Sequence, residues 1–413
     1  MSYGNRGYGY HVVQKPENVL IRAEELIASA TGKNAEREKR EALSQLHDFI
    51  SQAKNKRNWN KVYEPIMRRH LELCVDLKDA RHAKDGLHQY RSMCMQVDPM
   101  LLDSIIMHLM EMAEQKAQKA KSKADRRAVQ AASEVSDLDV EETPETIMLA
   151  SMTNEFARDR NDREMVLPWL KFLWEIYRAI LELLYKNSKL EKTYHRCAEK
   201  AFKFCTEYKR TLEFRRLCEM LRTHLAFIQK GMGQIRNGIK QEWTPESREM
   251  HLFTRFQQLE AATALELWNE GFRAVEDIYA INLVVKKSTQ MLMIKYYEKL
   301  TSIFWVSDMP LFHAYAWFKF YMLNRGSNKD LTPEQRSAYA TAALVATLSM
   351  PLTSKSTDVS DDEIEKNQRM AMLLDFQANP SREALLSEIV ACGVLAEVSP
   401  EYAGLHKLFE ETF

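Results

Sequence analysis

The sequence predicts an all-α fold, a right-handed solenoid of tetratricopeptide-like helix pairs. Glycine and proline are scarce, at 12 and 11 of 413 residues, so turn residues are too few for an all-β fold or for most nucleotide-binding α/β folds. Apolar residues recur at helical spacing almost throughout, and strand-like alternation is hard to find. The breakers between these segments are short, which favours antiparallel neighbouring helices.

Composition limits the class of protein further. Lys plus Arg and Asp plus Glu each number 58, so the formal net charge is zero, and 45% of the residues are apolar, enough for a real core. The six cysteines include no CxxC pair, which indicates reduced thiols in a cytoplasmic protein. No apolar stretch approaches the ~20 residues that a membrane span needs. We therefore expect a cytoplasmic protein that does not cross a membrane.

Helix-breaking residues divide the N-terminal third of the chain into segments. We expect a flexible leader over residues 1–14 and N-terminal helical repeats over residues 15–127. In the first helix the apolar residues share one face, and they are Val19, Leu20, Ala23, Leu26 and Ile27. Lys116–Arg127 carries six basic residues and one acid, so we expect a helix end that frays into solvated chain. Residues 128–164 are predicted to form an acidic linker and a short helix.

The remaining chain is predicted to be helical as well. Residues 165–288 form middle helical repeats, and Gly231–Trp243, which collects three glycines, is predicted to be an exposed loop. Residues 289–413 form the last helical segment. The pairs Thr244-Pro245 and Thr332-Pro333 each predict a helix start, with threonine as the N-cap and proline at the first helical position.

Motifs for catalysis or cofactor binding are absent from the sequence. It contains no GxGxxG, no GxxxxGK[ST], no HExxH and no GxSxG. His195 and Cys197 are two residues apart, so on a helix they point in nearly opposite directions and cannot share a metal ion. We expect a protein that is not an enzyme, with no catalytic residue, no cofactor and no metal site.

Two groups of polar residues are candidates for partner contact. In the first helix Lys15, Asn18 and Arg22 lie opposite the apolar face, and such a stripe on a terminal helix either docks a partner or simply caps the repeat. The second group is basic and is suited to phosphates or an acidic partner, although ordinary solvated helix faces have the same composition. Its members are Lys54, Lys56, Arg57, Arg68 and Arg69.

Aromatic residues gather in the last helical segment, and these residues have two interpretations. Aromatic stripes at helical spacing are usually core, but some such residues anchor a partner subunit. The candidates for a partner-subunit contact are Trp305, Phe312, Trp317 and Phe320.

Several segments carry a specific resemblance to a known family. They run in order along the chain: Lys15–Leu26 (KPENVLIRAEEL), Glu64–Met67 with Leu71–Val75, Ala83–Tyr90 (AKDGLHQY), Pro168–Glu175, Ala201–Cys205, Glu266–Trp268 with Ala274–Asp277, and Tyr296–Tyr297 with Leu311–Ala314. In these segments the chain resembles the N-terminal portion of the largest subunit of eukaryotic translation initiation factor three, which contains a PCI module.

The resemblance implies a scaffold that works in preinitiation complex assembly. Residues 289–413 would then be the helical part of a PCI module, with its winged helix absent from this chain. Family members pair with the c subunit of the factor and with its other subunits. They also dock on the small ribosomal subunit, on its proteins and on rRNA or mRNA, with the N-terminal arm facing it. The alternative is a PCI scaffold subunit of a proteasome-lid or signalosome-type complex, which shares the architecture.

Overall fold

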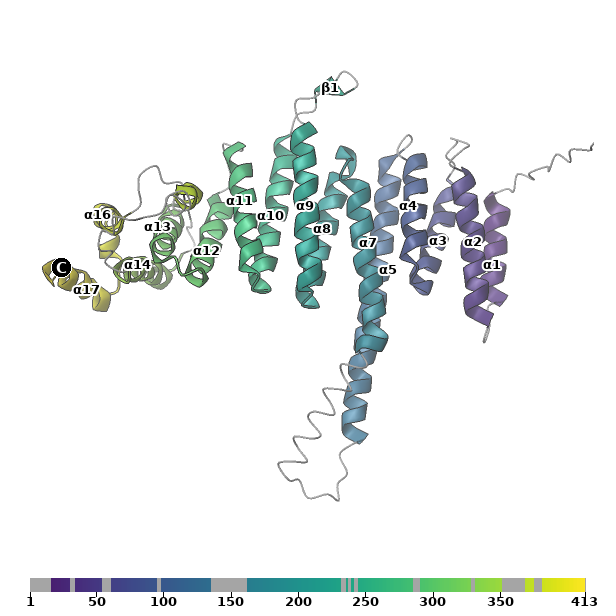
Figure 1. Ribbon diagram of the computed structural model, residues 1–413, viewed down its shortest axis with the longest axis horizontal. Coiled ribbons are helices and arrows are strands. Elements are labelled where there is room, and N and C mark those ends of the chain that lie inside the picture. Colours follow the sequence, from purple (N-terminus) through teal and green to yellow (C-terminus); the bar gives the residue numbers. More distant parts are fainter. Residues whose placement is uncertain are drawn as a thin grey trace, which may run out of the picture. The chain divides into compact units, whose positions relative to one another are not determined.

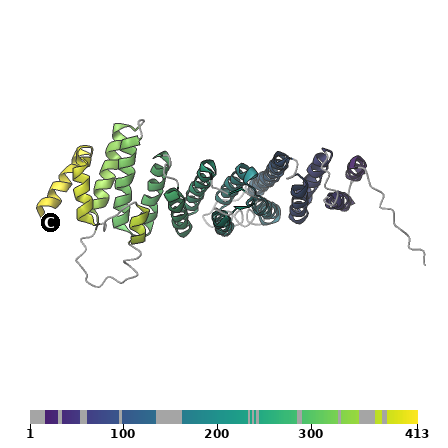
Figure 2. The ribbon, with the colours of Figure 1, turned by 90° about the horizontal axis from the view of Figure 1, so that it is seen from above.

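The computed structural model describes residues 16–29, 34–53, 61–94, 98–134, 162–231, 235–236, 239–240, 244–284, 290–327, 331–350, 368–374 and 381–412. The chain forms two compact units, Met1–Ala201 and Phe202–Phe413. Apart from one short hairpin, the elements of the described residues are helices, which confirms the all-α helical-repeat class. Within each unit, successive helices lie side by side, as Figure 1 and the view from above in Figure 2 show.

The first unit is built from helices that pack on their neighbours in the sequence. In order they are α1 (Pro16–Ser29), α2 (Ala35–Ala53), α3 (Tyr63–Leu77), α4 (Ala80–Cys94), α5 (Pro99–Glu134), the π-helical turn η3 (Asp162–Val166), α7 (Leu167–Leu184) and the 3₁₀ turn η4 (Ser188–Leu190). Helix α8 (Glu191–Glu207) begins in this unit and ends in the second.

Helix α7 is the clearest core element of the first unit, with an apolar stripe at i, i+3, i+4, i+7 and i+11. Its five members are all buried: Leu173, Ile176, Tyr177, Ile180 and Leu184. At roughly 1.5–3 kcal/mol for each fully buried large apolar side chain, such a stripe is a major source of stability. The Tyr177 hydroxyl donates a hydrogen bond of 2.6 Å to Glu114 Oε1, so its polar end is satisfied by α5.

The prediction of a frayed helix end at Lys116–Arg127 is wrong. These residues lie within α5, which continues to Glu134. Few large apolar residues occur in this stretch, but alanines supply the packing face, and Ala117, Ala120 and Ala124 are buried. The predicted linker over residues 128–164 is partly helical, because residues 128–134 continue α5 to Glu134 and residues 162–164 belong to Asp162–Val166. Residues 135–161 and residues 1–14 lie outside the described residues.

The second unit continues with helices of similar length. In order it contains α9 (Thr211–Gly231), β1 (Ile235–Arg236), β2 (Ile239–Lys240), α10 (Pro245–Ala264), α11 (Trp268–Val284), α12 (Gln290–Val306), α13 (Pro310–Ser327), α14 (Pro333–Leu348), α16 (Arg382–Ala391), the 3₁₀ turn η5 (Val394–Ala396) and α17 (Pro400–Thr412). Helices α10 and α11 pack together, as do α12 and α13, and α13 and α14.

The two threonine caps are confirmed. Thr244 Oγ1 accepts a hydrogen bond of 3.2 Å from the Ser247 N–H at the start of α10. Thr332 Oγ1 accepts one of 3.3 Å from the Gln335 N–H, and the Gln335 side chain accepts from the Thr332 N–H, which completes a capping box at α14.

Four helix ends share a turn that the sequence pattern did not predict. Helices α3, α8, α10 and α12 are each followed by a residue in the left-handed conformation, and these residues are Lys78, Lys209, Glu266 and Asp308, with φ between 50° and 57°. After α3, the Lys78 N–H donates to Val75 O and the Asp79 N–H to Cys74 O, which is the Schellman pattern. The other three turns repeat both bonds. Because glycine normally fills this position, the low glycine content concealed these turns.

The predicted loop Gly231–Trp243 contains the hairpin. Ile235 pairs with Lys240, and Arg236 pairs with Ile239, in antiparallel register. The sequence between the two strands reads Asn237-Gly238, which is the strongest short hairpin signal and was overlooked in predicting a loop. In the part of the chain that the structure describes, no helix combines the length and the apolar character that crossing a membrane requires.

Candidate interaction surfaces

Helix α1 presents the polar stripe that the sequence predicts. Its inner face packs on α2 through the buried Val19 and Ala23, while Asn18 and Arg22 are exposed. Arg22 makes no ion pair with a described residue, so its charge is available to a partner. Ile21, which was not among the predicted contact residues, is 54% exposed beside Arg22. Lys15 lies outside the described residues.

The predicted basic group is only partly available. Lys54, Lys56 and Arg57 lie outside the described residues. On α3, Arg68 pairs with Glu64 at 3.1 Å and donates a hydrogen bond of 2.9 Å to Ser104 Oγ on α5. Arg69 pairs with Glu72 at 2.7 Å. Both arginines are half-buried, and their charges are compensated within the first unit.

The four aromatic candidates separate into core and surface. Phe312 and Phe320 are 4% and 6% exposed and belong to the core of the second unit, because α13 is covered by both α12 and α14. Their side chains therefore do not reach a partner. Trp317 is half-buried, and Trp305, at the end of α12, is 71% exposed. Of the four, Trp305 is the residue that a partner can cover.

Trp305 is part of a row of rings across α12, α13 and α14. Its ring lies 5.2 Å from that of His313, which meets Trp317 edge-on at 6.4 Å. The His313 ring is oriented by a 2.9 Å hydrogen bond between its Nδ1 and the Thr301 carbonyl, and burial lowers its pKa. These rings form a mostly apolar surface, on which Trp305 is the most exposed ring.

A second exposed surface of this unit lies between α14 and α17. It is a groove with a volume of about 870 Å³, lined mainly by small side chains such as Ala338, Thr341 and Ala342 and bordered by Val345 and Tyr402. The sequence pattern did not reveal this groove, because its lining comes from two helices that are far apart in the chain.

Two buried titratable groups of the first unit, His70 and Cys74, lie in its core. His70 is buried between α2 and α4, with its Nε2 3.3 Å from His47 Nδ1 and its Nδ1 3.8 Å from Cys74 Sγ. Desolvation lowers the pKa of His70 to about 3, and burial raises the pKa of the Cys74 thiol well above its usual range. A neutral imidazole beside a protonated thiol is a poor nucleophilic pair.

The other buried thiols behave in the same way. Burial raises the pKa of Cys94 and of Cys205 to about 12, and it raises the pKa values of Cys197 and Cys218 further. The buried cysteines are therefore inert apolar side chains at neutral pH.

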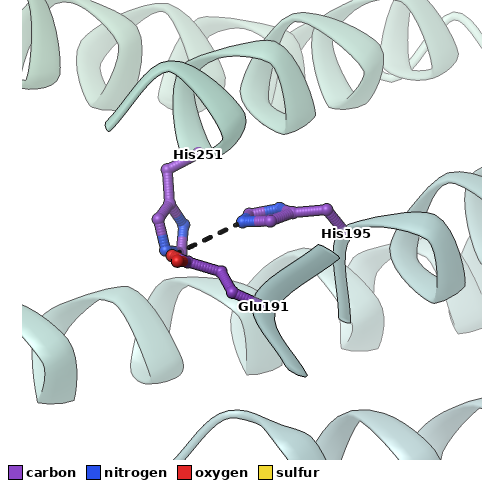
Figure 3. Close-up of side chains that lie close together, drawn as sticks. All are labelled: Glu191, His195 and His251. Carbon is purple, nitrogen blue, oxygen red and sulfur yellow. Dashed lines mark ion pairs between the residues drawn. The ribbon is translucent and has the colours of Figure 1, made fainter. Parts of the chain in front are cut away.

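One group of three side chains consists of residue types that can bind a metal ion. Figure 3 shows Glu191 and His195 one turn apart on α8, with Glu191 Oε1 3.9 Å from His195 Nε2, together with His251 of α10. A carboxylate and two imidazoles are donors that suit zinc. Glu191 and His195 belong to the first unit and His251 to the second, so the three do not form a metal site within either unit.

Comparison with known proteins gives one consistent result. Residues 17–413 match the family model described as "eIF3a, PCI domain, TPR-like region". The chain is 45% identical over 412 residues to the A subunit of eukaryotic translation initiation factor 3 of Arabidopsis thaliana, a match that covers 97% of this chain and 40% of that protein. It is 42% identical over 407 residues to the protein of the same name from Homo sapiens, covering 97% of this chain and 28% of that protein.

The protein of the same name from Nicotiana tabacum is 44% identical over 412 residues, a match that covers 42% of that protein. The chain thus spans 28% to 42% of the length of these relatives. The description of the matched region as TPR-like and as a PCI domain agrees with the predicted helical repeats.

Proposed function

The chain belongs to the family of the A subunit of eukaryotic translation initiation factor 3, and from that premise we propose that it is a non-catalytic scaffold in the cytoplasm. It docks on the small ribosomal subunit, and it pairs with a second PCI protein of the same factor, the c subunit. The observation that carries the proposal is the family match over residues 17–413, a region built from packed helix pairs. Such folds work by presenting extended surfaces.

The ribosome-docking surface is proposed to begin at α1. Asn18 and Arg22 are exposed on a terminal helix, and Lys15, Lys54, Lys56 and Arg57 are the basic residues that the sequence adds. Arg68 and Arg69 are weaker candidates, because their charges are already paired with glutamates. The expected partners are ribosomal proteins, with rRNA or mRNA as a further contact.

The surface for the c subunit is proposed to centre on Trp305. Trp305 is a large exposed aromatic side chain, and the His313 ring connects it to the half-buried Trp317. Exposed tryptophans on such a surface are frequent anchors of protein–protein interfaces. Phe312 and Phe320 support this surface from beneath. The alternative assignment, a PCI subunit of a proteasome-lid or signalosome-type complex, has no observation that favours it over the initiation-factor family.

A non-catalytic role fits the chemistry of the described residues. The buried cysteines are held protonated and His70 is held neutral at physiological pH, so neither is poised for acid–base or nucleophilic work. The relatives carry the name of an initiation factor, which names no reaction.

Co-sedimentation of this chain with purified small ribosomal subunits, with and without the c subunit, tests the proposal. We expect salt-sensitive sedimentation that the c subunit does not abolish, and a separate complex with the c subunit in the absence of ribosomes. The control is Trp305→Ala, which should weaken the complex with the c subunit and leave sedimentation of the chain alone unchanged. Failure to bind either partner would contradict the proposal.

A further inference from the structure

The end of α12 combines an exposed aromatic ring with negative charge. Trp305 is 71% exposed, more than any other large apolar side chain among the described residues. Glu298 lies seven residues earlier, so it occupies the same side of the helix, about 10 Å from Trp305 along the axis. Asp308 follows Trp305 by three residues, and its N–H donates a hydrogen bond of 3.2 Å to the Trp305 carbonyl. One carboxylate therefore precedes the ring along the chain and another follows it.

Neither carboxylate is neutralised by a described residue. Glu298 and Asp308 are exposed, and neither makes an ion pair with a described side chain. The two lysines of α12 do not supply the missing charge beside the ring. Lys295 pairs with Glu260 of α10 at 3.8 Å, and the half-buried Lys299 lies about 120° around the helix from the indole ring. The uncompensated charge beside the ring is therefore negative.

The imidazole next to Trp305 adds no positive charge to this surface. The two ring centroids are 5.2 Å apart, and the planes of Trp305 and His313 are inclined by 47°. His313 Nδ1 is 2.9 Å from the Thr301 carbonyl, which can only accept, so Nδ1 carries the proton of the neutral ring. Burial lowers the pKa of His313, and the ring is therefore neutral at pH 7.

We propose that Trp305, Glu298 and Asp308 together bind an arginine side chain of a protein partner. The guanidinium stacks on the exposed indole ring, and the two carboxylates supply its counter-charge. Arginine suits this surface better than lysine, because the planar guanidinium is weakly hydrated and stacks on aromatic faces. The proposal rests on the proposed function for the identity of the partner, the c subunit, and it adds the chemistry that the partner presents at Trp305.

The same two carboxylates disfavour other occupants. A nucleic acid that stacked a base on Trp305 would bring its phosphates toward Glu298 and Asp308, and like charges repel. A purely apolar partner segment would cover the two carboxylates without a counter-charge, which is costly. An arginine avoids both costs, because its aliphatic stem can cover Val306, which is 50% exposed next to Trp305, while its charged head remains beside the carboxylates.

Fluorescence anisotropy with a labelled peptide of alternating arginine and alanine tests this inference, and the corresponding lysine–alanine peptide is the second probe. Trp305→Leu keeps an apolar side chain and removes the aromatic face. Glu298→Gln/Asp308→Asn removes both charges and keeps the shapes of the side chains. We expect each variant to bind the arginine peptide about three- to tenfold more weakly than the unaltered chain, and the unaltered chain to bind the lysine peptide more weakly than the arginine peptide.

The matched control is Glu24→Gln/Glu25→Gln, which removes two exposed carboxylates from α1 and leaves α12 intact. We expect the control to bind the arginine peptide as the unaltered chain does. Unchanged affinity in Trp305→Leu or in Glu298→Gln/Asp308→Asn would overturn the inference, and so would an equal loss in the control. Equal binding of the two peptides by the unaltered chain would overturn the assignment of arginine.

Binding of the purified c subunit to the same variants separates this inference from the proposed function. We expect Glu298→Gln/Asp308→Asn to weaken the complex, with a smaller loss as KCl is raised, because salt screens exposed charges. Binding of the arginine peptide without binding of the c subunit would support the inference and contradict the proposed function. If Trp305→Leu weakens the complex and Glu298→Gln/Asp308→Asn leaves it unchanged, the proposed partner surface stands and the arginine contact is wrong.

Discussion

Arg255 on α10 and Asp277 on α11 form an ion pair of 3.5 Å in the second unit. Arg255 also donates hydrogen bonds to Gln258 Oε1 at 2.6 Å and to the Leu221 carbonyl on α9 at 3.0 Å. Arg222 of α9 reaches the same Asp277 oxygen at 3.5 Å. One carboxylate and one buried guanidinium therefore connect three successive helices.

Asp277→Asn is expected to destabilise the chain by about 3 kcal/mol, because it leaves Arg255 buried without its counter-charge. Urea denaturation followed by circular dichroism measures the change in the free energy of unfolding. Glu36→Gln is the control: Glu36 pairs with Arg40 at 2.6 Å, both side chains are exposed, and loss of such a pair should cost less than about 1 kcal/mol. Equal effects of the two substitutions would contradict the role given to Asp277.

The left-handed turns predict an unusual stabilisation. Lys209→Gly and Glu266→Gly should each raise the free energy of unfolding by up to about 1 kcal/mol, because glycine adopts positive φ without steric cost. Thermal denaturation tests this, with the exposed Arg216→Gly within α9 as the control, which should destabilise by about 1 kcal/mol. Destabilisation at Lys209 or Glu266 as large as that of the control would contradict the turn assignment.

Gly86 and Gly326 form a matched pair. A Cβ on Gly86 would lie 2.7 Å from His70 Cε1, whereas nothing lies within 4 Å of one on Gly326. Gly86→Ala should therefore destabilise the chain by roughly 1–3 kcal/mol through overpacking. Gly326→Ala should be neutral or stabilising, through the better helix propensity of alanine. The free energy of unfolding of each variant decides the point, and similar values for the two would refute the close packing at His70.

His70 makes stability depend on pH. Its pKa falls from an ordinary value near 6.5 to about 3 on folding, so between these values the unfolded chain binds the extra proton. Its contribution to stability is complete above pH 6.5 and is lost progressively as the pH falls toward 3. The slope approaches about 1.4 kcal/mol per pH unit.

His70→Gln should flatten this dependence when the free energy of unfolding is measured between pH 7 and 4.5. Burial also lowers the pKa of His47 on α2, so some slope should remain. An unchanged slope in the variant would show that His70 titrates normally in the folded chain.

Trp305 lies on the surface and Phe312 in the core, so substitution by alanine should affect them differently. Trp305→Ala should leave the free energy of unfolding within about 0.5 kcal/mol, because the side chain is 71% exposed. Phe312→Ala should cost about 3–5 kcal/mol, because the ring is buried against Phe304. If Trp305→Ala binds the c subunit as tightly as the unaltered chain does, the proposed partner surface is wrong.

Helices whose packing face uses large apolar residues could be predicted from the sequence. The stripe of α7 and the caps Thr244 and Thr332 follow directly from spacing and cap chemistry, and the structure confirms them. The end of α5 could not be found this way, because its packing face consists of alanines. The turns at Lys78 and Glu266 were missed because no glycine or proline marks them.

The surfaces were harder to predict than the fold. The spacing of the apolar residues within α1 was enough to predict that Arg22 lies on its exposed side, because the face on which a residue lies depends on that helix alone. Spacing could not separate Trp305 from Phe312, because burial there depends on α14, which follows later in the chain. Arg68 and Arg69 were predicted as contact residues. Their glutamate partners, one turn or less away, could have been inferred from the i, i+4 and i, i+3 spacing.

We propose that α1, together with the basic residues Lys15 and Arg57, docks on the small ribosomal subunit. The most direct test of this proposal is the salt dependence of co-sedimentation for the unaltered chain and for Lys15→Glu/Arg22→Glu/Arg57→Glu, with Lys192→Glu as a control for a single exposed charge. We expect weaker binding and a shallower salt slope for the triple variant, and unchanged binding for the control. Identical affinity and identical salt slope in the triple variant and the unaltered chain would contradict it.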